Sequence, residues 1–171
     1  YFERALSYSN LNNYIKSISD YLTIEEIDPE YNVALYNNLA VAYENLNDYE
    51  KALEVYNRAI KMDSTYSRAY LNRAKLYSND FDDNESALLD YNKVIELDPE
   101  DSDGYYYRGV FYDDYLEDYD KAIEDFTKGI ELNSSDLDLY FERARCYASL
   151  NNYIKSIADF LTIEEIDPEY D

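Results

Sequence analysis

The sequence predicts an all-α fold, a right-handed solenoid of five helix pairs. The 171 residues repeat with a period near 35 over the whole chain, and the ten residues LTIEEIDPEY occur twice, at Leu22–Tyr31 and Leu161–Tyr170. Within each repeat, aromatic and small residues recur at spacings of three, four and seven, which place them on one face of a helix. Only three Gly and three Pro are present, which disfavours a sheet protein rich in tight turns.

The boundaries of the repeats are marked by residues that end a helix. Steps of 35, 35, 35 and 34 residues separate five such positions, each preceded by Asp or Asn: Pro29, Ser64, Pro99, Ser134 and Pro168. The expected repeats span residues 1–32, 33–66, 67–101, 102–136 and 137–171, and together they form one repeat domain.

The fifth repeat is a near copy of the first, since Tyr1–Tyr31 and Tyr140–Tyr170 differ at only six positions. Four repeats therefore form a cassette of 139 residues. The chain opens without Met inside a helical pattern, so we expect it to be an excerpt of a longer repeat array.

The first helix of each repeat is predicted from three positions: an aromatic residue, a small residue four later, and a second aromatic three after that. In the second repeat these are Tyr36, Ala40 and Tyr43. The same positions in the other repeats hold Tyr1, Ala5 and Tyr8; Tyr70, Ala74 and Tyr77; Tyr105, Gly109 and Tyr112; and Tyr140, Ala144 and Tyr147.

The second helix is predicted to begin after an Asn or Asp that caps its N-terminus: Asn13, Asp48, Asp118 and Asn152. A small residue then faces the first helix, and a large ring follows four residues later to fill the space between the helices. The small residues are Ser17, Ala52, Ala87, Ala122 and Ser156, and the rings are Tyr21, Tyr56, Tyr91, Phe126 and Phe160.

With these columns in place, Tyr36–Asp63 and Tyr105–Asn133 resemble tetratricopeptide repeats, and the resemblance covers the whole chain. Two features depart from the family pattern. The third repeat is one residue longer, with Asn84 where a ring is expected and Phe81 as its substitute. Arg replaces the usual apolar residue three positions after the first aromatic in four repeats, at Arg4, Arg73, Arg108 and Arg143.

The resemblance implies a non-catalytic scaffold for protein interactions, in which first helices line a concave surface that holds an extended peptide or a partner helix. The expected partner-binding residues lie on the exposed face of the first helices. They are Phe2, Asn37, Asn38, Arg68, Leu71, Asn72, Lys75, Asp103, Tyr106, Tyr107, Val110, Asp113, Asp114, Phe141 and Arg145. A clamp for a C-terminal carboxylate, which the family also uses, is rejected because too few of its cationic and amide positions match.

The fourth repeat is the strongest candidate anchor. Tyr106 and Tyr107 fall outside the columns that the scaffold explains, and eleven Asp and Glu but only two basic residues lie between Asp98 and Asp125. Exposed rings beside carboxylates suit a segment that contains Lys or Arg. The alternative, that the two rings only extend the packing between helices, stays open.

Charge limits the partners. With 15 Lys and Arg against 38 Asp and Glu, the formal net charge is −23, which disfavours nucleic acid and favours a basic protein or peptide. The charge has a simpler alternative role, which is to keep the chain in solution. No apolar run approaches the length of a membrane span, so we expect no membrane partner. The compartment is left open, with the cytoplasm slightly favoured.

The residues for catalysis are missing from the sequence. It contains no His, no Gly-rich phosphate loop and no Ser or Cys beside a base, and Cys146 is the single cysteine. The acidic stretches Asp80–Asp83 and Asp113–Asp120 lack the spacing and the Gly of a calcium loop. We therefore expect no enzyme activity, no cofactor and no specific metal site.

A rival function belongs to a different class: a structural spacer or self-assembling repeat array without a dedicated peptide ligand. The two ends of a repeat stack expose apolar surface, and weak head-to-tail association of separate chains through these ends is its expected form.

Overall fold

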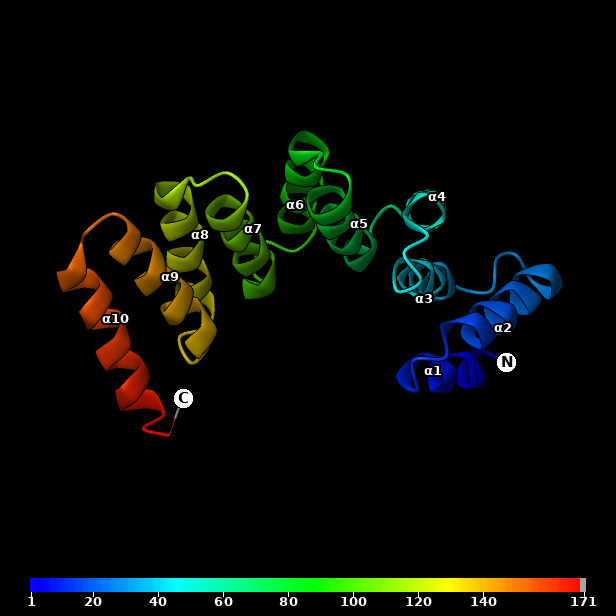
Figure 1. Cartoon of the computed structure of the whole chain (residues 1–171), viewed down its shortest axis with the longest axis horizontal. Coiled ribbons are helices and arrows are strands. Elements are labelled where there is room, and N and C mark those ends of the chain that lie inside the picture. The colour runs from blue at the N-terminus through cyan, green and yellow to red at the C-terminus, as the bar shows by residue number, and fades with distance from the viewer. Residues whose placement is uncertain (170–171) are drawn as a thin grey trace. The chain divides into compact units, whose positions relative to one another are not determined.

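The computed structural model describes residues 1–169, and over that range the chain forms ten α-helices and no strand (Figure 1). The predicted all-α fold of helix-turn-helix repeats is confirmed. The helices are α1 (Phe2–Asn10), α2 (Tyr14–Ile27), α3 (Val33–Glu44), α4 (Tyr49–Met62), α5 (Ser67–Asp80), α6 (Asn84–Leu97), α7 (Ser102–Asp114), α8 (Tyr119–Leu132), α9 (Leu137–Ser149) and α10 (Tyr153–Ile166).

The chain divides into two compact units, Tyr1–Val94 and Ile95–Asp171. In the first unit α1 packs against α2 and α3 against α4, and the pairs join through α2 with α3 and α4 with α5. In the second unit α7 packs against α8 and α9 against α10, with α8 against α9. Successive first helices also touch, α1 with α3, α3 with α5, and α7 with α9. Each unit therefore presents a row of neighbouring first helices.

The ring of the second helix is buried at the centre of the first four repeats, whereas Phe160 of the fifth is 42% exposed. Tyr21, Tyr56 and Phe126 are completely buried, and the small residues of the first helices are equally buried. At Gly109 the fit is closest, because a Cβ atom there would lie 2.6 Å from Cε1 of Phe126. The ring therefore packs directly against the backbone of α7, which lets the two helices approach closely.

The arginines that depart from the family pattern form ion pairs between the two helices of a repeat, in which the aspartate is buried and the arginine is partly buried in three repeats and mostly exposed at Arg4. Each guanidinium donates two hydrogen bonds of 2.6–2.9 Å to an aspartate that stands just before the ring of the second helix. It also lies 5.0–5.9 Å from the centre of the first aromatic ring of its repeat. The pairs are Arg4–Asp20, Arg73–Asp90, Arg108–Asp125 and Arg143–Asp159.

The second repeat has an apolar pair in the same place. Leu39 stands at the arginine position and Val55 at the aspartate position, and both are buried. The two positions therefore change together, from a charged pair to an apolar one.

The turns inside the repeats share one backbone conformation. The residue two positions before the start of each second helix has a φ of 50–59°, in the left-handed region: Asn12, Asn47, Asp82, Glu117 and Asn151. Asn and Asp tolerate this region better than other residues with a side chain. The predicted caps follow, and the side chains of Asn13, Asp118 and Asn152 accept from the helix N–H groups. Asp48 stands at its predicted cap position, but its carboxylate binds Lys51 instead.

In the third repeat, Asn84 begins α6 and Phe81 lies in the turn before it. The fourth repeat has the same extra residue, since seven residues separate Tyr112 from Tyr119 as they separate Tyr77 from Asn84. The Phe81 ring is 6.4 Å from that of Tyr77, so it packs against the second aromatic of the first helix. Asp83 accepts from the N–H of Ser86 and serves as the cap. Helix α5 ends three residues after Tyr77, whereas α9 ends two residues after Tyr147, so the extra residue of the third repeat extends its first helix.

We predict that Arg73→Leu lowers the free energy of unfolding by about 3 kcal/mol, because it leaves the buried Asp90 carboxylate without its partner. Adding Asp90→Val restores the apolar pair that the second repeat already uses, so the double variant should equal or exceed the wild type in stability. Urea unfolding of the wild type, both single variants and the double variant measures this. A double variant as unstable as Arg73→Leu would contradict it.

We predict that Glu117→Asn raises the free energy of unfolding by about 0.5–1 kcal/mol, because Asn adopts a left-handed backbone at lower cost than Glu. Thermal unfolding measures the gain. Glu117→Gln is the control: it removes the same charge and keeps the conformational cost, so it should not stabilise. An equal gain in both variants would show that charge, not backbone conformation, is responsible.

Candidate partner-binding surface

In the first unit, three asparagines link the first helices α3 and α5. Asn72 Nδ2 donates to Asn37 Oδ1 at 3.0 Å, and Asn37 Nδ2 donates to Asn38 Oδ1 at 3.4 Å. Asn37 is only 2% exposed, so it is buried rather than on the exposed face as expected. The reason is that α3 and α5 approach each other at this position, and the bonded amides allow the polar side chain to be buried. Asn38 and Asn72 remain half-buried.

The remaining expected residues of this unit lie along α5. Arg68 is exposed in its first turn, and Leu71 and Lys75 are half-buried farther along the helix. Lys75 lies near Glu44, whose pKa is raised by burial and lowered in part by the hydrogen bond from Tyr56. This surface is a mixture of amide, basic and apolar groups.

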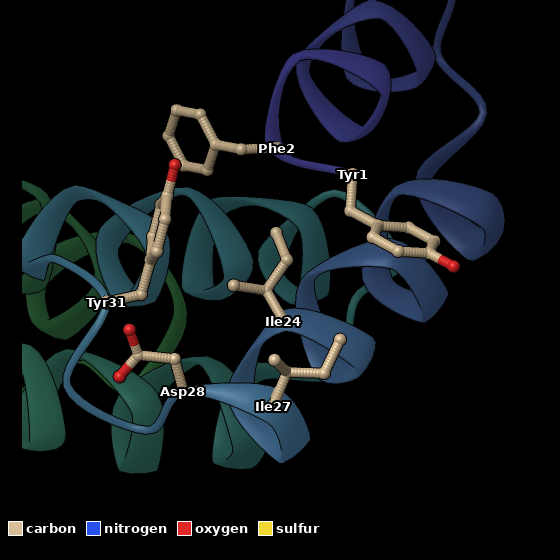
Figure 2. A pocket seen from close by; sticks show the side chains of 6 residues that line it. All are labelled: Tyr1, Phe2, Ile24, Ile27, Asp28 and Tyr31. Carbon is tan, nitrogen blue, oxygen red and sulfur yellow. The ribbon is translucent and has the colours of Figure 1, made fainter.

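Phe2 forms one wall of an open pocket of about 330 Å³. Its ring lies 5.9 Å from that of Tyr21 and 5.7 Å from that of Tyr31. Figure 2 shows Ile24 and Ile27 between Tyr1 on one side and Phe2 with Tyr31 on the other, and the carboxylate of Asp28 near the edge. The pocket is therefore apolar with one acidic group.

In the second unit, Arg145 of α9 is surrounded by carboxylates from two first helices. Its guanidinium lies 3.6 Å from Asp113 and 3.7 Å from Asp114, both near the end of α7. It also pairs with Glu142, one turn earlier on α9. We call Asp113, Asp114, Glu142 and Arg145 the Arg145 cluster. Glu142 was not among the expected residues, although its position three residues before Arg145 on a helix is a signal for such a pair.

The Arg145 cluster is partly buried, and this burial shifts the pKa values of two of its carboxyl groups. Burial raises the pKa of Asp113, and the charge of Arg145 opposes the shift. Burial likewise raises the pKa of Glu142, again opposed by Arg145. Cys146 is completely buried beside Asp113, and burial raises the pKa of its thiol to about 12. The thiol is therefore protonated at neutral pH and is a packing group.

The two extra tyrosines lie side by side near this cluster. The rings of Tyr106 and Tyr107 meet edge to face at 5.2 Å, and Tyr106 also lies 6.3 Å from the core ring Phe126. Burial, followed by the charges of Glu142 and Asp138, raises the pKa of Tyr106 to about 12. The Tyr106 ring thus contributes to the packing between helices, while its hydroxyl lies near acidic groups.

The other expected residues of this unit lie around these groups. Asp103 is exposed in the first turn of α7, and Val110 is half-buried on the same helix. Phe141 is 37% exposed and packs edge to face on Phe160 at 5.9 Å. The structure therefore brings together Tyr106, Tyr107, Asp113, Asp114 and Arg145 from the expected set, with Glu142 and Cys146 in addition.

Comparison with protein families agrees with this architecture. Models described as tetratricopeptide repeat match residues 1–31, 33–66, 67–101, 90–124 and 112–171. The chain belongs to the tetratricopeptide repeat family. No curated protein sequence matches it.

Solved tetratricopeptide repeat structures share the fold. MamA residues 41-end from Desulfovibrio magneticus RS-1 is 16% identical, with a TM-score of 0.82 over 99% of this chain and 94% of that one. A tetratricopeptide repeat protein from Parabacteroides merdae ATCC 43184 is 25% identical, with a TM-score of 0.82 over 98% of this chain and 66% of that one. YrrB, described as a protein with an unusual peptide-binding site, is 24% identical, with a TM-score of 0.69 over 86% of this chain and 75% of that one.

Within residues 1–169, no helix is long and apolar enough to cross a membrane. Over the same range, no group of three or more His, Cys, Asp and Glu side chains is placed to hold a metal ion.

We predict a pH dependence of stability that originates in the Arg145 cluster. Because burial raises the pKa of Asp113 and Glu142, the folded chain binds their protons more tightly than the unfolded chain does. Their contribution to the free energy of unfolding should therefore be largest below about pH 4, the ordinary carboxyl range, and decrease as the pH rises through the higher folded pKa values.

The test compares urea unfolding of the wild type and of Asp113→Asn with Glu142→Gln, from about pH 4 to pH 7. The variant changes the net charge only from −23 to −23 + 2 = −21, so general repulsion is nearly the same in both proteins. The stability of the wild type relative to the variant should fall as the pH rises. A difference that does not vary with pH would show that the two carboxyls are hydrated.

Proposed function

We propose that this tetratricopeptide repeat chain is a non-catalytic protein-interaction scaffold that binds a basic segment, extended or helical, along the exposed sides of its first helices. The observation that carries the proposal is the Arg145 cluster, in which carboxylates from α7 and α9 surround a guanidinium. A surface that holds an arginine of its own chain has the geometry to hold one from a partner.

The charge of the cluster leaves room for a second cation. Asp113, Asp114 and Glu142 supply three carboxylates, and Arg145 supplies one positive charge. Asp138 adds another carboxylate near Tyr106. With a net charge of −23 on the whole chain, a basic partner is attracted from a distance and then meets a local excess of acid.

The tyrosines supply the apolar part of the proposed contact. Tyr107 is half-buried beside Tyr106, so part of the ring pair faces the surface. The face of a tyrosine ring attracts Lys or Arg, and the rest of the ring covers the aliphatic part of these side chains. YrrB, which shares the fold, is described as having a peptide-binding site, and this supports a peptide as the ligand class.

The surface on α3 and α5 supports binding of the peptide backbone. Asn38 and Asn72 are half-buried and bonded through Asn37, so their positions are fixed while parts of both amides reach the surface. An amide side chain can donate to a backbone carbonyl and accept from a backbone N–H at once. This surface would add affinity without selecting a sequence.

We predict that Arg145→Leu strengthens the binding of basic peptides by about tenfold, or 1.4 kcal/mol, because it removes the internal competitor for the three carboxylates. The near copy in the first repeat has Leu6 at this position, so leucine fits the helix. Fluorescence anisotropy with labelled peptides that carry Lys or Arg at spacings of one to seven residues measures the affinity, at low and moderate salt. Affinity should fall as salt rises.

Lys128→Leu is the matched control, since it makes the same change in charge on the second helix α8 and should change affinity little. Weaker or unchanged binding by Arg145→Leu would show that the partner does not use these carboxylates. Asp113→Asn with Asp114→Asn should weaken binding in both backgrounds.

The exposed apolar residues of α10 favour a second candidate function, the self-assembling array. Ile154, Ile157 and Leu161 are each more than half exposed. Light scattering on the same samples separates the two functions. A mass that stays monomeric as concentration rises excludes the array, and a mass that grows while basic peptides fail to bind supports it.

A further inference from the structure

Three positions on the outer side of each second helix face the solvent. They stand six and two residues before the ring and one residue after it, at helical spacings of four and three, so they form one stripe along the helix. The residues at these positions are exposed in all five repeats, apart from the half-buried Thr127. The second, third and fourth repeats have a neighbour on each side, so this exposure is not caused by a chain end. We call the three positions the outer stripe.

In the middle repeats the outer stripe is mostly polar and carries acids. It consists of Glu50, Glu54 and Asn57 in α4; Glu85, Leu89 and Asn92 in α6; and Asp120, Glu124 and Thr127 in α8. In α2 the same positions hold Ile15, Ser19 and Leu22. Ile15 is 72% exposed and Leu22 is 37% exposed. Because the repeat folds equally well with acids at this place, its own packing does not require the two apolar residues of α2.

The apolar outer stripe recurs in α10, where it consists of Ile154, Ala158 and Leu161. Ile154 is 85% exposed, at a position that every other repeat also leaves exposed. The stripes of α2 and α10 differ only at the central position, where Ser19 and Ala158 are both small. Both stripes therefore keep the same order: a large apolar residue, a small residue and a second large apolar residue.

This order reads the same in both directions along the helix, so the stripe is complementary to an antiparallel copy of itself. The small central residues let two such helices approach closely, and Ile15 of one helix then lies against Leu22 of the other. A contact of this kind has a two-fold axis at its centre, near Ser19, and uses the same surface on both partners. The pattern therefore favours a second copy of the chain as the occupant.

The charges around the stripe favour the same occupant. Two chains that each carry a net charge of −23 repel one another, so a contact between them has to avoid opposed carboxylates. Between residues 14 and 23 of α2 the single carboxylate is Asp20, which is buried and bound to Arg4. The matching stretch of α10 has only Asp159, which is buried and bound to Arg143. Two copies can therefore approach at these faces with little local repulsion.

We propose that the outer stripe of α2 binds the outer stripe of a second copy of this chain, on α2 or on α10, in an antiparallel two-fold contact. The stripe lies on second helices and leaves the first helices to a basic segment, so this inference does not rest on the proposed function. It also differs from a head-to-tail array, because the chain ends take no part. One stripe is small and binds weakly, and two stripes on each chain strengthen the association.

Cross-linking tests where the contact lies. Ser19→Cys with Ala158→Cys, in a Cys146→Ala background, places a thiol at the centre of both apolar stripes. Glu54→Cys with Glu124→Cys in the same background is the matched control, because it places thiols at the same position of α4 and α8. Under mild oxidation at about 0.15 M salt, the first protein should form disulfide-linked dimers at least about tenfold faster than the control. The control loses two negative charges, which by itself would favour its collisions.

A second measurement tests the apolar contact itself. Ile15→Gln with Ile154→Gln changes two exposed residues and leaves the net charge at −23, so the fold and the general repulsion stay the same. In sedimentation velocity the mass of the wild type should rise with concentration, and the variant should associate at least about tenfold more weakly. Added salt should strengthen the association by screening the repulsion, which is opposite to its effect on a basic peptide.

Three results would overturn the proposal. Equal rates of cross-linking for the two pairs of thiols would show random collision. A rise in mass that the glutamine variant retains would place the contact elsewhere, at the chain ends for example. A wild type that stays monomeric at every concentration and salt would show that a second copy does not occupy the stripe. Binding of basic peptides should be the same in the wild type and the glutamine variant, so a failure of the proposed function is detected separately.

Discussion

In the fourth repeat a ring from the second helix lies against a small residue of the first helix, and the close approach of α7 and α8 follows from that contact. Phe126 packs directly on Gly109, where there is no room for even a methyl group. Tyr21 and Tyr56 are buried as completely, as are the small residues Ala5 and Ala40 of their repeats. Because the helices are this close, groups on either side of the ring must be small, apolar or fully paired. The polar side chains near the ring must therefore have hydrogen-bond or ion-pair partners.

The arginine–aspartate pairs show one solution. They lie directly beside the ring, and the guanidinium fits between the carboxylate and an aromatic face, so both charges are bonded after they leave water. The second repeat reaches the same spacing with Leu39 and Val55. We infer that the charged pair contributes register more than stability, since an apolar pair fills the same space. Two of the arginines also contact the preceding repeat: Arg73 donates to Asn57 and Arg143 donates to Thr127.

Periodicity predicted the helices, the rings and the caps, because each of these depends on residues close together in sequence. It did not predict the partners of Arg73 or Arg143, which stand 17 and 16 residues away on another helix. The signal was present, since the aspartate is missing only from the repeat that lacks the arginine. The burial of Asn37 depends on Asn72, 35 residues away, and no pattern within one repeat shows it. Contacts between repeats, such as this one, are tertiary contacts. The residue pattern of the first helices alone does not predict them.

Comparing the first and fifth repeats, which are near copies, distinguishes residues that maintain the fold from residues that have diverged. Of the six positions at which the first and fifth repeats differ, two change Leu6 and Ser7 into Arg145 and Cys146, which lie against the acids of α7. Drift at an exposed surface does not explain Cys146, because this residue is completely buried. Its thiol fills a site beside Asp113 that a copy of the first repeat would fill with a hydroxyl. The residues that differ between the two repeats therefore contact the neighbouring repeat. This is expected if each repeat keeps its ring contact while its surface residues change to fit the repeat before it.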